Sequence, residues 1–258
     1  MDQLFRQQTT NSDSERNDRL KYLAMMIIGH RGSAGTVPEN TLSSVQTALD
    51  AGAPWVEIDV RLIADKLFVI HDRHVDRTTN GSGDIYAMSE AEILQLDAGD
   101  GAGIPTLESV IELIQAKAAL NIELKDVESL GPVLSVVTAT LMNKPAWAGR
   151  LMISTFEQEI HRAMAERLPP GCLLGVLLNA VSDDAVPYAS SLGAYSLNLS
   201  FAQLHEDIVS SAHQAGLKVF VYTVNESDHI DSCLAVGVDA IYTDFPARSA
   251  AYLDASSA

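Results

Sequence analysis

Charged side chains recur at alternate positions in two apolar segments of the chain. Glu57 and Asp59 lie in one segment, and Glu123 and Lys125 lie in the other. If both segments are β-strands, residues two apart point to the same face. Charged groups on an interior face are costly unless a cation or a charged ligand compensates them. The spacing fits a buried charged site, and it fits equally well a rim held by ordinary salt bridges.

Carboxylates are the ligands that hard cations prefer. Oxygen ligands from two strands favour Mg²⁺ or Ca²⁺ over zinc, which usually recruits histidine or cysteine. A carboxylate-bound divalent ion can polarise a phosphoryl oxygen and neutralise the charge that develops there. The pattern therefore favours a divalent ion and chemistry at a phosphate.

Two histidines lie where strands are expected to end. His30 is followed by Arg31 and Gly32, and His71 is followed by Asp72. Imidazole has an ordinary pKa near 6.5, so two of them at one rim can act as an acid–base pair at neutral pH. Arg31 offers a planar fork that matches phosphate oxygens. We expect the other histidines to be solvated, in loops or on helix surfaces: His74, His161, His205, His213 and His229.

Apolar segments alternate with amphipathic segments along most of the chain. Strands are expected near Ala24–His30, Trp55–Arg61, Ala119–Lys125, Leu151–Ser154, Cys172–Leu178, Ala194–Leu199, Leu217–Val224 and Val238–Thr243. Helices are expected over Asn40–Ala51, Thr106–Lys117, Ser129–Met142, Glu157–Leu168, Ser182–Leu192, His205–Ala215 and Glu226–Val236. This order is typical of a parallel sheet, and eight such units close into a (β/α)₈ TIM barrel. An open doubly wound sheet is the alternative, but no strand is followed by a dinucleotide-binding glycine fingerprint.

One segment breaks the alternation. Leu67–His71 has the composition of a strand, yet only the turn Ala64–Lys66 separates it from the strand before it. A parallel crossover needs about a dozen residues or more, so we expect a hairpin here. The following stretch, Asp72–Ile104, is rich in Gly, Asp and Thr and is expected to be a small insertion after the second strand. Barrel active sites lie at the C-terminal ends of the strands, where such insertions accumulate.

Composition limits the partners of this chain. It has 258 residues, 47% of them hydrophobic, and a formal net charge of −17. An acidic surface repels nucleic acid and anionic lipid, so we expect a small-molecule ligand, no nucleic acid and no stable membrane association. No segment reaches the ~20 apolar residues of a membrane span, and the polar N-terminal segment lacks the features of a signal peptide. A homo-oligomer is left open.

These features predict one cytoplasmic domain. Residues 1–22 are expected to be a disordered lead-in, and residues 23–258 a TIM-barrel domain with its insertion at about 72–104. Cys172 and Cys233 lie far apart in apolar patterns, which is typical of buried reduced thiols.

Nine short segments, taken in order, resemble the glycerophosphodiester phosphodiesterase family of the bacterial, cytoplasmic type, over Ile27 to about Arg248. They are His30-Arg31-Gly32, Pro38-Glu39-Asn40-Thr41, Glu57-Ile58-Asp59, His71-Asp72, Arg77-Thr78-Thr79, Ile104-Pro105-Thr106-Leu107-Glu108, Asn121-Ile122-Glu123-Leu124-Lys125, Ile153-Ser154-Thr155-Phe156 and Thr243-Asp244-Phe245-Pro246. Each segment alone is a weak signal, but their order and context are specific.

The resemblance implies a metal-dependent enzyme on a (β/α)₈ barrel. Its substrates would be deacylated phospholipids such as glycerophosphocholine and glycerophosphoethanolamine, hydrolysed to sn-glycerol 3-phosphate and an alcohol. One divalent ion, Mg²⁺ or Ca²⁺, is implied. The implied site residues are the metal ligands Glu57, Asp59 and Glu123, the acid–base pair His30 and His71, the phosphate clamp Arg31 and Lys125, and Phe156 and Tyr222 at the pocket mouth.

The chain departs from the family pattern in two places. Tyr222 stands where the family often has tryptophan, which affects the preference for the alcohol. The hairpin turn Ala64-Asp65-Lys66 lacks the usual glycine and is one residue shorter, which affects only the hairpin tip.

Two other functions are compatible with the motifs. A related phospholipase-type phosphodiesterase on lysolipids or inositol lipids would need an apolar rim on the loops, and the acidic charge disfavours anionic membranes. A non-catalytic glycerophosphodiester-binding protein would be expected to lack a metal ligand or a histidine, whereas all of them are present.

Overall fold

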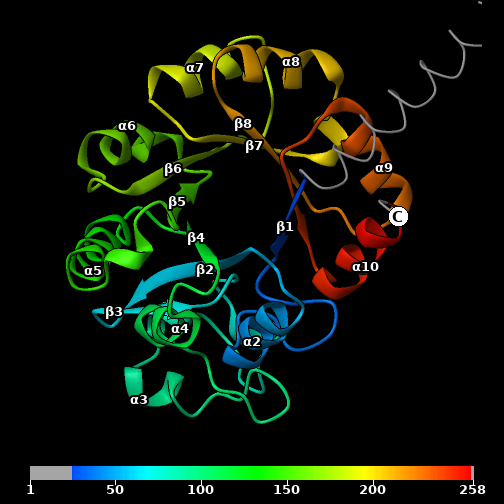
Figure 1. The fold of residues 1–258 in the computed structure, drawn as a ribbon. Coiled ribbons are helices and arrows are strands. Elements are labelled where there is room, and N and C mark those ends of the chain that lie inside the picture. Colours follow the sequence, from blue (N-terminus) through cyan, green and yellow to red (C-terminus); the bar gives the residue numbers. More distant parts are fainter. Residues whose placement is uncertain (1–24, 257–258) are drawn as a thin grey trace, which may run out of the picture.

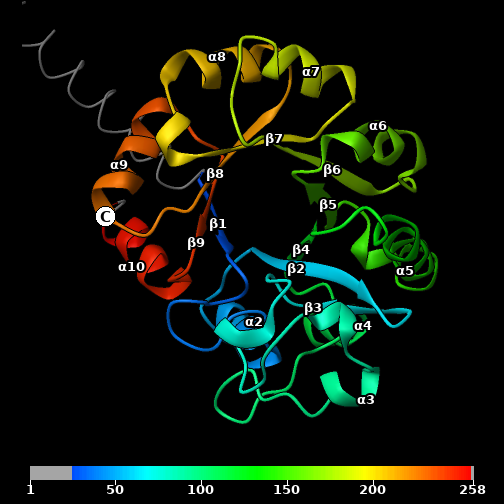
Figure 2. The ribbon, with the colours of Figure 1, turned by 180° about the vertical axis from the view of Figure 1, so that it is seen from behind.

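The computed structural model describes residues 25–256, whose strands form a parallel barrel surrounded by helices (Figures 1 and 2). The barrel strands are β1 (Met26–Gly29), β2 (Trp55–Ile63), β4 (Ala119–Leu124), β5 (Leu151–Thr155), β6 (Cys172–Leu177), β7 (Ser196–Ser200), β8 (Lys218–Tyr222) and β9 (Ala240–Thr243). The helices outside them are α2 (Leu42–Asp50), α4 (Leu107–Ile114), α5 (Leu130–Asn143), α6 (Gln158–Arg167), α7 (Ala185–Ser191), α8 (Glu206–Gln214), α9 (Ser227–Val236) and α10 (Pro246–Ser256).

Strand β1 closes the barrel because it pairs with a neighbour on both sides. Ile28 is in register with Trp55 of β2 and with Tyr242 of β9, and both pairings are parallel. The remaining strands follow in the order β9, β8, β7, β6, β5, β4 and β2. The expected (β/α)₈ barrel is thereby confirmed over the open-sheet alternative.

The side chains of β2 alternate between two faces, so this one strand contributes both to the hydrophobic core and to the functional site. Val56, Ile58 and Val60 are fully buried in the large core between the strands and the helices. Trp55 belongs instead to the aromatic layer inside the barrel, where its ring packs edge-on against Phe220 at 6.4 Å. The residues two and four positions after Trp55 share its face and lie farther along the strand. This places the strand's carboxylates inside the barrel, above an apolar floor.

The last helix, α10, was not predicted from the sequence. It packs beside β1 and α9, and it begins at Pro246, whose fixed φ suits the first turn of a helix. Its sequence is rich in alanine and serine, and Ser249 is buried together with Leu253. With so few large apolar side chains, the helical period is not visible in the sequence.

The expected hairpin after β2 is confirmed. Strand β3 (Lys66–Val69) runs antiparallel to β2, with Ile63 opposite Lys66. The two turn residues have positive φ, 48° at Ala64 and 62° at Asp65. That is the geometry of a tight type I′ turn, which asparagine and glycine favour. The turn is therefore built without the glycine that the family pattern uses.

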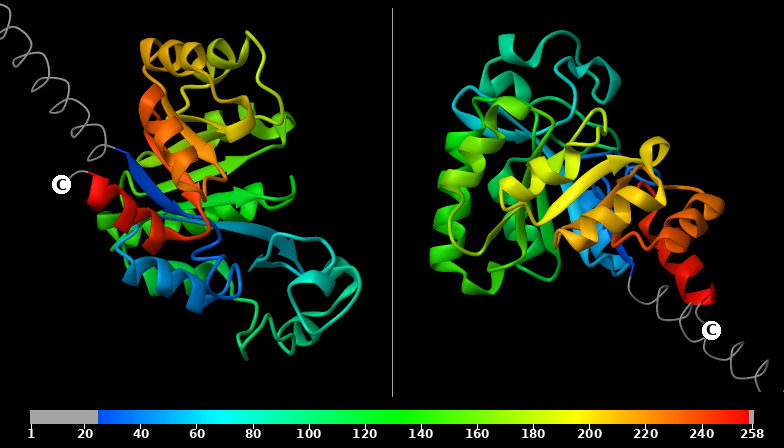
Figure 3. Two further views of the ribbon diagram at one scale, coloured as in Figure 1. Left: turned by 90° about the vertical axis from the view of Figure 1, so that its right-hand side faces the viewer. Right: turned by 90° about the horizontal axis from the view of Figure 1, so that it is seen from above.

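The segment after β3 forms a small unit with its own core. It contains η1 (Val75–Arg77), η2 (Ile85–Ala87) and the short helix α3 (Glu90–Ile93). In the side view, the unit lies beyond the C-terminal end of β2, on the side to which the strand arrows point (Figure 3). Its apolar side chains, together with Ile63 of β2 and Phe68 of β3, form a cluster separate from the barrel core: Ile63, Phe68, Ile70, Val75, Ile85, Ile93, Ala98 and Ile104.

Three further expectations concern the rest of the chain. The disordered lead-in expected over residues 1–22 lies outside the described residues. Within residues 25–256, none of the helices has the length and apolar character needed to cross a membrane. Cys172 is a half-buried free thiol and Cys233 a buried one.

Candidate functional site

Three carboxylates meet inside the barrel. The register between β2 and β4 sets Asp59 beside Glu123 and Glu57 beside Asn121. Glu57, Asp59 and Glu123 each offer an oxygen, and these three oxygens lie within 4.8 Å of one another. The residues are 1%, 1% and 8% exposed, so they are interior groups and not part of a solvated rim. The sequence interpretation that placed them in a buried site is the one that the structure supports.

Burial and mutual repulsion disfavour the negatively charged forms of two of the three carboxyl groups. Burial, together with the nearby charge of Asp59, raises the pKa of Glu57 to about 8. Burial and Asp59 also raise the pKa of Glu123. Burial would raise the pKa of Asp59 as well, but Lys125 and Arg31 hold it below its usual value.

One oxygen of the cluster has no hydrogen-bond partner. Oε2 of Glu57 accepts a hydrogen bond of 2.9 Å from the backbone N–H of Arg31, whereas the buried Oε1 accepts none from the described residues. Buried polar atoms are normally satisfied, so an orphan here points to a ligand. Three converging carboxylates with an unsatisfied oxygen fit a hard divalent cation.

Two cationic side chains contact the cluster from the pocket rim. Nζ of Lys125 lies 2.6 Å from Oε1 of Glu123 and 3.5 Å from Oδ1 of Asp59. Nη1 of Arg31 donates to Oε1 of Glu39 over 2.7 Å. Nε of Arg31 lies 3.2 Å from Oδ2 of Asp59, but it is buried without a well-aligned hydrogen bond to any residue in 25–256. Arg31 therefore keeps an unsatisfied donor beside the carboxylates.

Each histidine at the rim is held by a carboxylate on its Nδ1 atom. The Nδ1 atom of His30 lies 2.7 Å from Oδ1 of Asp244, and that of His71 lies 2.6 Å from Oδ1 of Asp72. A hydrogen bond at Nδ1 fixes the ring and leaves Nε2 for a second partner. Both residues line the same pocket. The structure therefore brings the two predicted histidines together in equivalent settings.

The two imidazoles differ in the direction of their pKa shifts. Burial lowers the pKa of His30, but the hydrogen bond with Asp244 and the charge of Glu57 outweigh burial and raise it overall. Burial also lowers the pKa of His71, and there the attraction of Asp59 only partly offsets it.

A chain of ion pairs outside the pocket links His71 to Arg31. Asp72, which holds His71, accepts from Nε of Arg77 over 2.6 Å. Nη1 and Nη2 of Arg77 then reach the carboxylate of Glu39 over 2.8 Å each, and the same carboxylate holds Arg31. Opposing charges and hydrogen bonds from the two arginines lower the pKa of Glu39 despite its burial. This chain fastens the insertion to the loop after β1.

Sequence reasoning assigned no role to several of these partners. Asp244 is fixed by Asn225, whose Nδ2 lies 2.7 Å from its Oδ2. Glu39, Arg77 and Asp244 all lie in segments that resemble the family, which was the available signal. Asp244 could not be chosen as the partner of His30, because the two residues are 214 positions apart in the chain.

The residues around the carboxylates enclose a cavity of about 170 Å³, here called the inner pocket. Its apolar wall contains the rings of Phe156 and Tyr222, which meet edge-to-face at 5.7 Å between centroids. Nζ of Lys125 lies 6.0 Å from the centroid of Phe156, and the Tyr222 hydroxyl donates to the carbonyl of Leu178. The full lining is His30, Arg31, Glu57, His71, Glu123, Lys125, Phe156, Leu177, Tyr222, Thr223 and Tyr242. The predicted charged and aromatic residues thus face one cavity, except Asp59, which is not among its lining residues and contacts Arg31 and Lys125.

One histidine expected on a solvated surface is buried, so that expectation was wrong. His161 on α6 is 0% exposed; its Nε2 lies 2.9 Å from the carbonyl of Thr155 and its Nδ1 lies 3.0 Å from the Tyr188 hydroxyl. Burial lowers its pKa. The helix presents His161 with Ile160 and Met164 on its buried face. His74, His205 and His213 are exposed as expected, while His229 is half-buried against Phe201.

Comparison with known proteins gives consistent matches along most of the chain. The model of the glycerophosphoryl diester phosphodiesterase family matches residues 30–248. A glycerophosphodiester phosphodiesterase from Caldanaerobacter subterraneus subsp. tengcongensis is 34% identical over 230 aligned residues, covering 86% of this chain and 94% of that protein. One from Bacillus altitudinis is 32% identical, covering 86% and 96%. The structure of a phosphodiesterase from Oleispira antarctica, in complex with the product sn-glycerol-3-phosphate, has a TM-score of 0.80 and 32% identity, covering 90% of this chain and 98% of that chain.

Proposed function

Since this chain belongs to the glycerophosphoryl diester phosphodiesterase family, we propose that it hydrolyses glycerophosphodiesters, such as glycerophosphocholine and glycerophosphoethanolamine, to sn-glycerol 3-phosphate and an alcohol. The observation that carries the proposal is the inner pocket, where three buried carboxylates lie beside Arg31, Lys125 and two carboxylate-backed histidines. The product bound by the similar Oleispira antarctica enzyme supports the same reaction.

The proposal includes one divalent cation, Mg²⁺ or Ca²⁺, held by Glu57, Asp59 and Glu123. The orphaned Oε1 of Glu57 and the all-oxygen donor set support this assignment. When bound, the ion would polarise a phosphoryl oxygen and offset its developing charge.

Charge balance favours a diester over a monoester as the bound state. With a divalent ion present, the three carboxylates, Arg31 and Lys125 leave one net positive charge in the inner pocket. A singly charged phosphodiester neutralises that charge, whereas the dianionic monoester product exceeds it. Arg31 and Lys125 are assigned to the phosphate, and the fork of Arg31 can address two oxygens at once.

The two histidines are assigned to proton transfer. His30, aligned by Asp244, would deprotonate the nucleophile, and His71, aligned by Asp72, would protonate the leaving alcohol. The nucleophile is either water or the glycerol 2-hydroxyl; in the second case a cyclic phosphate forms and is then hydrolysed, with the two histidines exchanging roles. Glu57 is one of the charges that raise the pKa of His30, so a cation bound at Glu57 would lower that pKa again.

The proposed activity can be tested with a panel of glycerophosphodiesters assayed for glycerol 3-phosphate, with chelator, with Mg²⁺ and with Ca²⁺. We expect release that depends on one of the two cations. Vesicles of lysolipid or inositol lipid serve as the comparison substrates. Release from vesicles but not from the free diesters would favour a phospholipase-type enzyme, and binding without turnover would leave a non-catalytic binding protein.

A further inference from the structure

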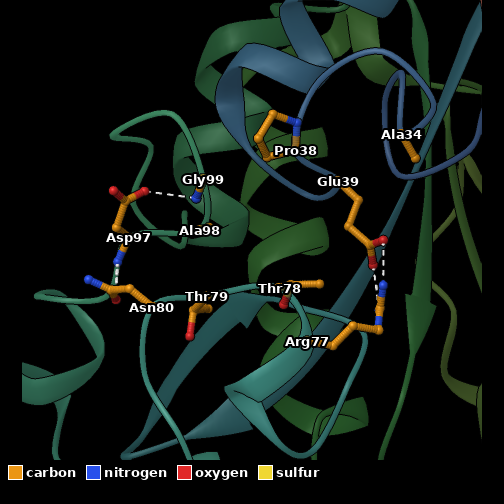
Figure 4. Close-up of a pocket in the computed structure, with 10 residues that line it drawn as sticks. All are labelled: Ala34, Pro38, Glu39, Arg77, Thr78, Thr79, Asn80, Asp97, Ala98 and Gly99. Carbon is orange, nitrogen blue, oxygen red and sulfur yellow. Dashed lines mark hydrogen bonds and ion pairs between the residues drawn. The ribbon is translucent and has the colours of Figure 1, made fainter.

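A second cavity, here called the outer cavity, opens beside the inner pocket. It has a volume of about 470 Å³ and lies between the loop after β1 and the insertion. Pro38 and Glu39 border it from the loop, while Arg77, Asn80 and Asp97 border it from the insertion (Figure 4). The outer cavity is more than twice as large as the inner pocket.

The Glu39–Arg77 ion pair separates the two spaces. On its inner side, Glu39 holds Arg31 of the inner pocket, and Arg77 holds Asp72 behind His71. A small gap lined by Glu39, His71 and Thr78 lies between them. The gap holds only about 10 Å³, so a molecule whose phosphate lies beside Arg31 would reach the outer cavity over the Glu39–Arg77 ion pair, where the Arg77 side chain is 50% exposed.

The inner pocket is too small for a complete diester. Its volume of about 170 Å³ lies below the ~300 Å³ at which small-ligand pockets usually begin. The glycerol phosphate part fits the charged end, so the alcohol must project outward. Because His71 is assigned to the leaving oxygen, the alcohol projects on the side of His71, which is the side of the outer cavity.

Six of the ten residues that line the outer cavity are polar or charged, the other four are Ala34, Pro38, Ala98 and Gly99, and none of the ten is aromatic. Threonine, asparagine and carboxylate side chains line it, and Oδ1 of Asp97 accepts from the backbone N–H of Gly99 over 2.8 Å. Oδ1 of Asn80 accepts from the backbone N–H of Asp97 over 2.9 Å. Among the described residues, the Thr78 hydroxyl and the Asn80 amide NH₂ have no hydrogen-bond partner. These groups suit an alcohol that carries several hydroxyls.

We propose that the outer cavity is the subsite for the leaving alcohol and that it selects hydroxyl-rich alcohols, such as glycerol or a cyclic polyol, over choline. The proposal rests on the proposed phosphodiesterase function. A quaternary ammonium group is best recognised by aromatic faces. The aromatic side chains Phe156 and Tyr222 line the inner pocket and not the outer cavity, so under this proposal Tyr222 does not set the alcohol preference, unlike the expectation from the family pattern.

The test compares glycerophosphoglycerol with glycerophosphocholine, using release of glycerol 3-phosphate for both. Thr78→Val keeps the side-chain shape and removes one hydroxyl. Asn80→Asp keeps the acceptor for Asp97 and removes the free NH₂ group. Thr140→Val, at a half-buried position on α5, is the matched control. Melting temperatures show whether each variant is folded.

We expect the wild type to prefer glycerophosphoglycerol. Thr78→Val and Asn80→Asp should each lower kcat/KM for that substrate by about three- to tenfold, the effect of one or two lost hydrogen bonds, and leave glycerophosphocholine unchanged. A folded variant whose kcat/KM falls equally for both substrates, or for neither, would overturn the assignment of the outer cavity as the alcohol subsite. A wild type that prefers glycerophosphocholine would overturn the selectivity, and one that releases glycerol 3-phosphate from neither would refute the phosphodiesterase function instead.

Discussion

The guanidinium of Arg61 donates two hydrogen bonds to the backbone carbonyl of His71, over 3.0 Å from Nε and 2.7 Å from Nη2. Its Nη1 also lies 3.5 Å from the carbonyl of Lys125. Arg61 does not line the inner pocket, yet it ties together the backbones of two residues that do.

Arg61 should therefore act as a positioning residue. Arg61→Gln is expected to lower kcat about tenfold with little change in KM, because small misplacements of reacting groups are costly. Arg61→Lys should recover part of the loss. Arg73→Gln is the control, since Arg73 also contacts the Tyr86 ring but not His71. Equal losses in the two glutamine variants would mean that only the insertion's packing matters.

Glu57→Gln should separate stability from activity. A carboxyl whose pKa is raised to about 8 in the folded state stabilises the fold fully below its unfolded pKa, and that stability is lost as pH rises through about 8. With chelator present, the variant should therefore melt at a higher temperature than the wild type above neutral pH, and at a similar temperature near pH 4.

The same variant should lose turnover by about two orders of magnitude, the usual cost of a lost transition-state charge contact. Divalent cation should raise the melting temperature of the wild type more than that of Glu57→Gln. Glu112→Gln is the control, because its side chain is 68% exposed. If Glu57→Gln turned over at the normal rate at limiting metal, Glu57 would not be a metal ligand.

Arg31→Lys keeps the positive charge and loses the fork. Hydrogen bonds to charged groups contribute about 1.5–3 kcal/mol, so we expect kcat/KM to fall by about ten- to a hundredfold. Arg150→Lys, at an exposed arginine bonded to the carbonyl of Ala116, provides the control for the substitution itself. If Arg31→Lys turned over like the wild type, Arg31 would supply only positive potential.

An activated leaving group should distinguish the two histidines. Nitrophenol leaves without protonation, so a nitrophenyl diester should restore turnover in the variant that lacks the acid and not in the one that lacks the base. We expect rescue in His71→Ala and none in His30→Ala, with His74→Ala close to wild type. The opposite pattern would exchange the two roles.

The nucleophile can be identified with a 2-deoxy substrate. If the glycerol 2-hydroxyl attacks the phosphorus of its own molecule, it has the proximity advantage of an intramolecular reaction. A 2-deoxy glycerophosphodiester should then inhibit competitively but turn over extremely slowly. Turnover of this substrate at the normal rate would assign the attack to water.

Local patterns were enough to predict most of the fold. The alternation of apolar and amphipathic segments predicted the barrel strands and seven of the helices, and the short turn before Leu67 predicted the hairpin. Helix α10 was missed because alanine and serine carry little hydrophobic signal. His161 was misjudged because a single imidazole does not reveal which side of a helix it faces.

The parts of the site that could be predicted are those whose residues lie close together in the sequence. Glu57 and Asp59 share a face because they are two apart in one strand, and that relation is visible in the sequence. The pairing of His30 with Asp244 joins opposite ends of the chain across the β1–β9 seam. Such a pairing exists only after the barrel closes, so no local pattern could have predicted it.

The insertion buries its apolar side chains in a cluster of its own, and β3 serves both units at once. Leu67 and Val69 face the barrel core, while Phe68 between them faces the core of the insertion. Substitutions in separate clusters usually have additive effects on stability. The stability costs of substitutions in the insertion and in the barrel should therefore sum, except at β3 and at the Glu39–Arg77 ion pair, where the two units share contacts. Away from those contacts, the insertion can vary in sequence while the barrel keeps the residues of the inner pocket.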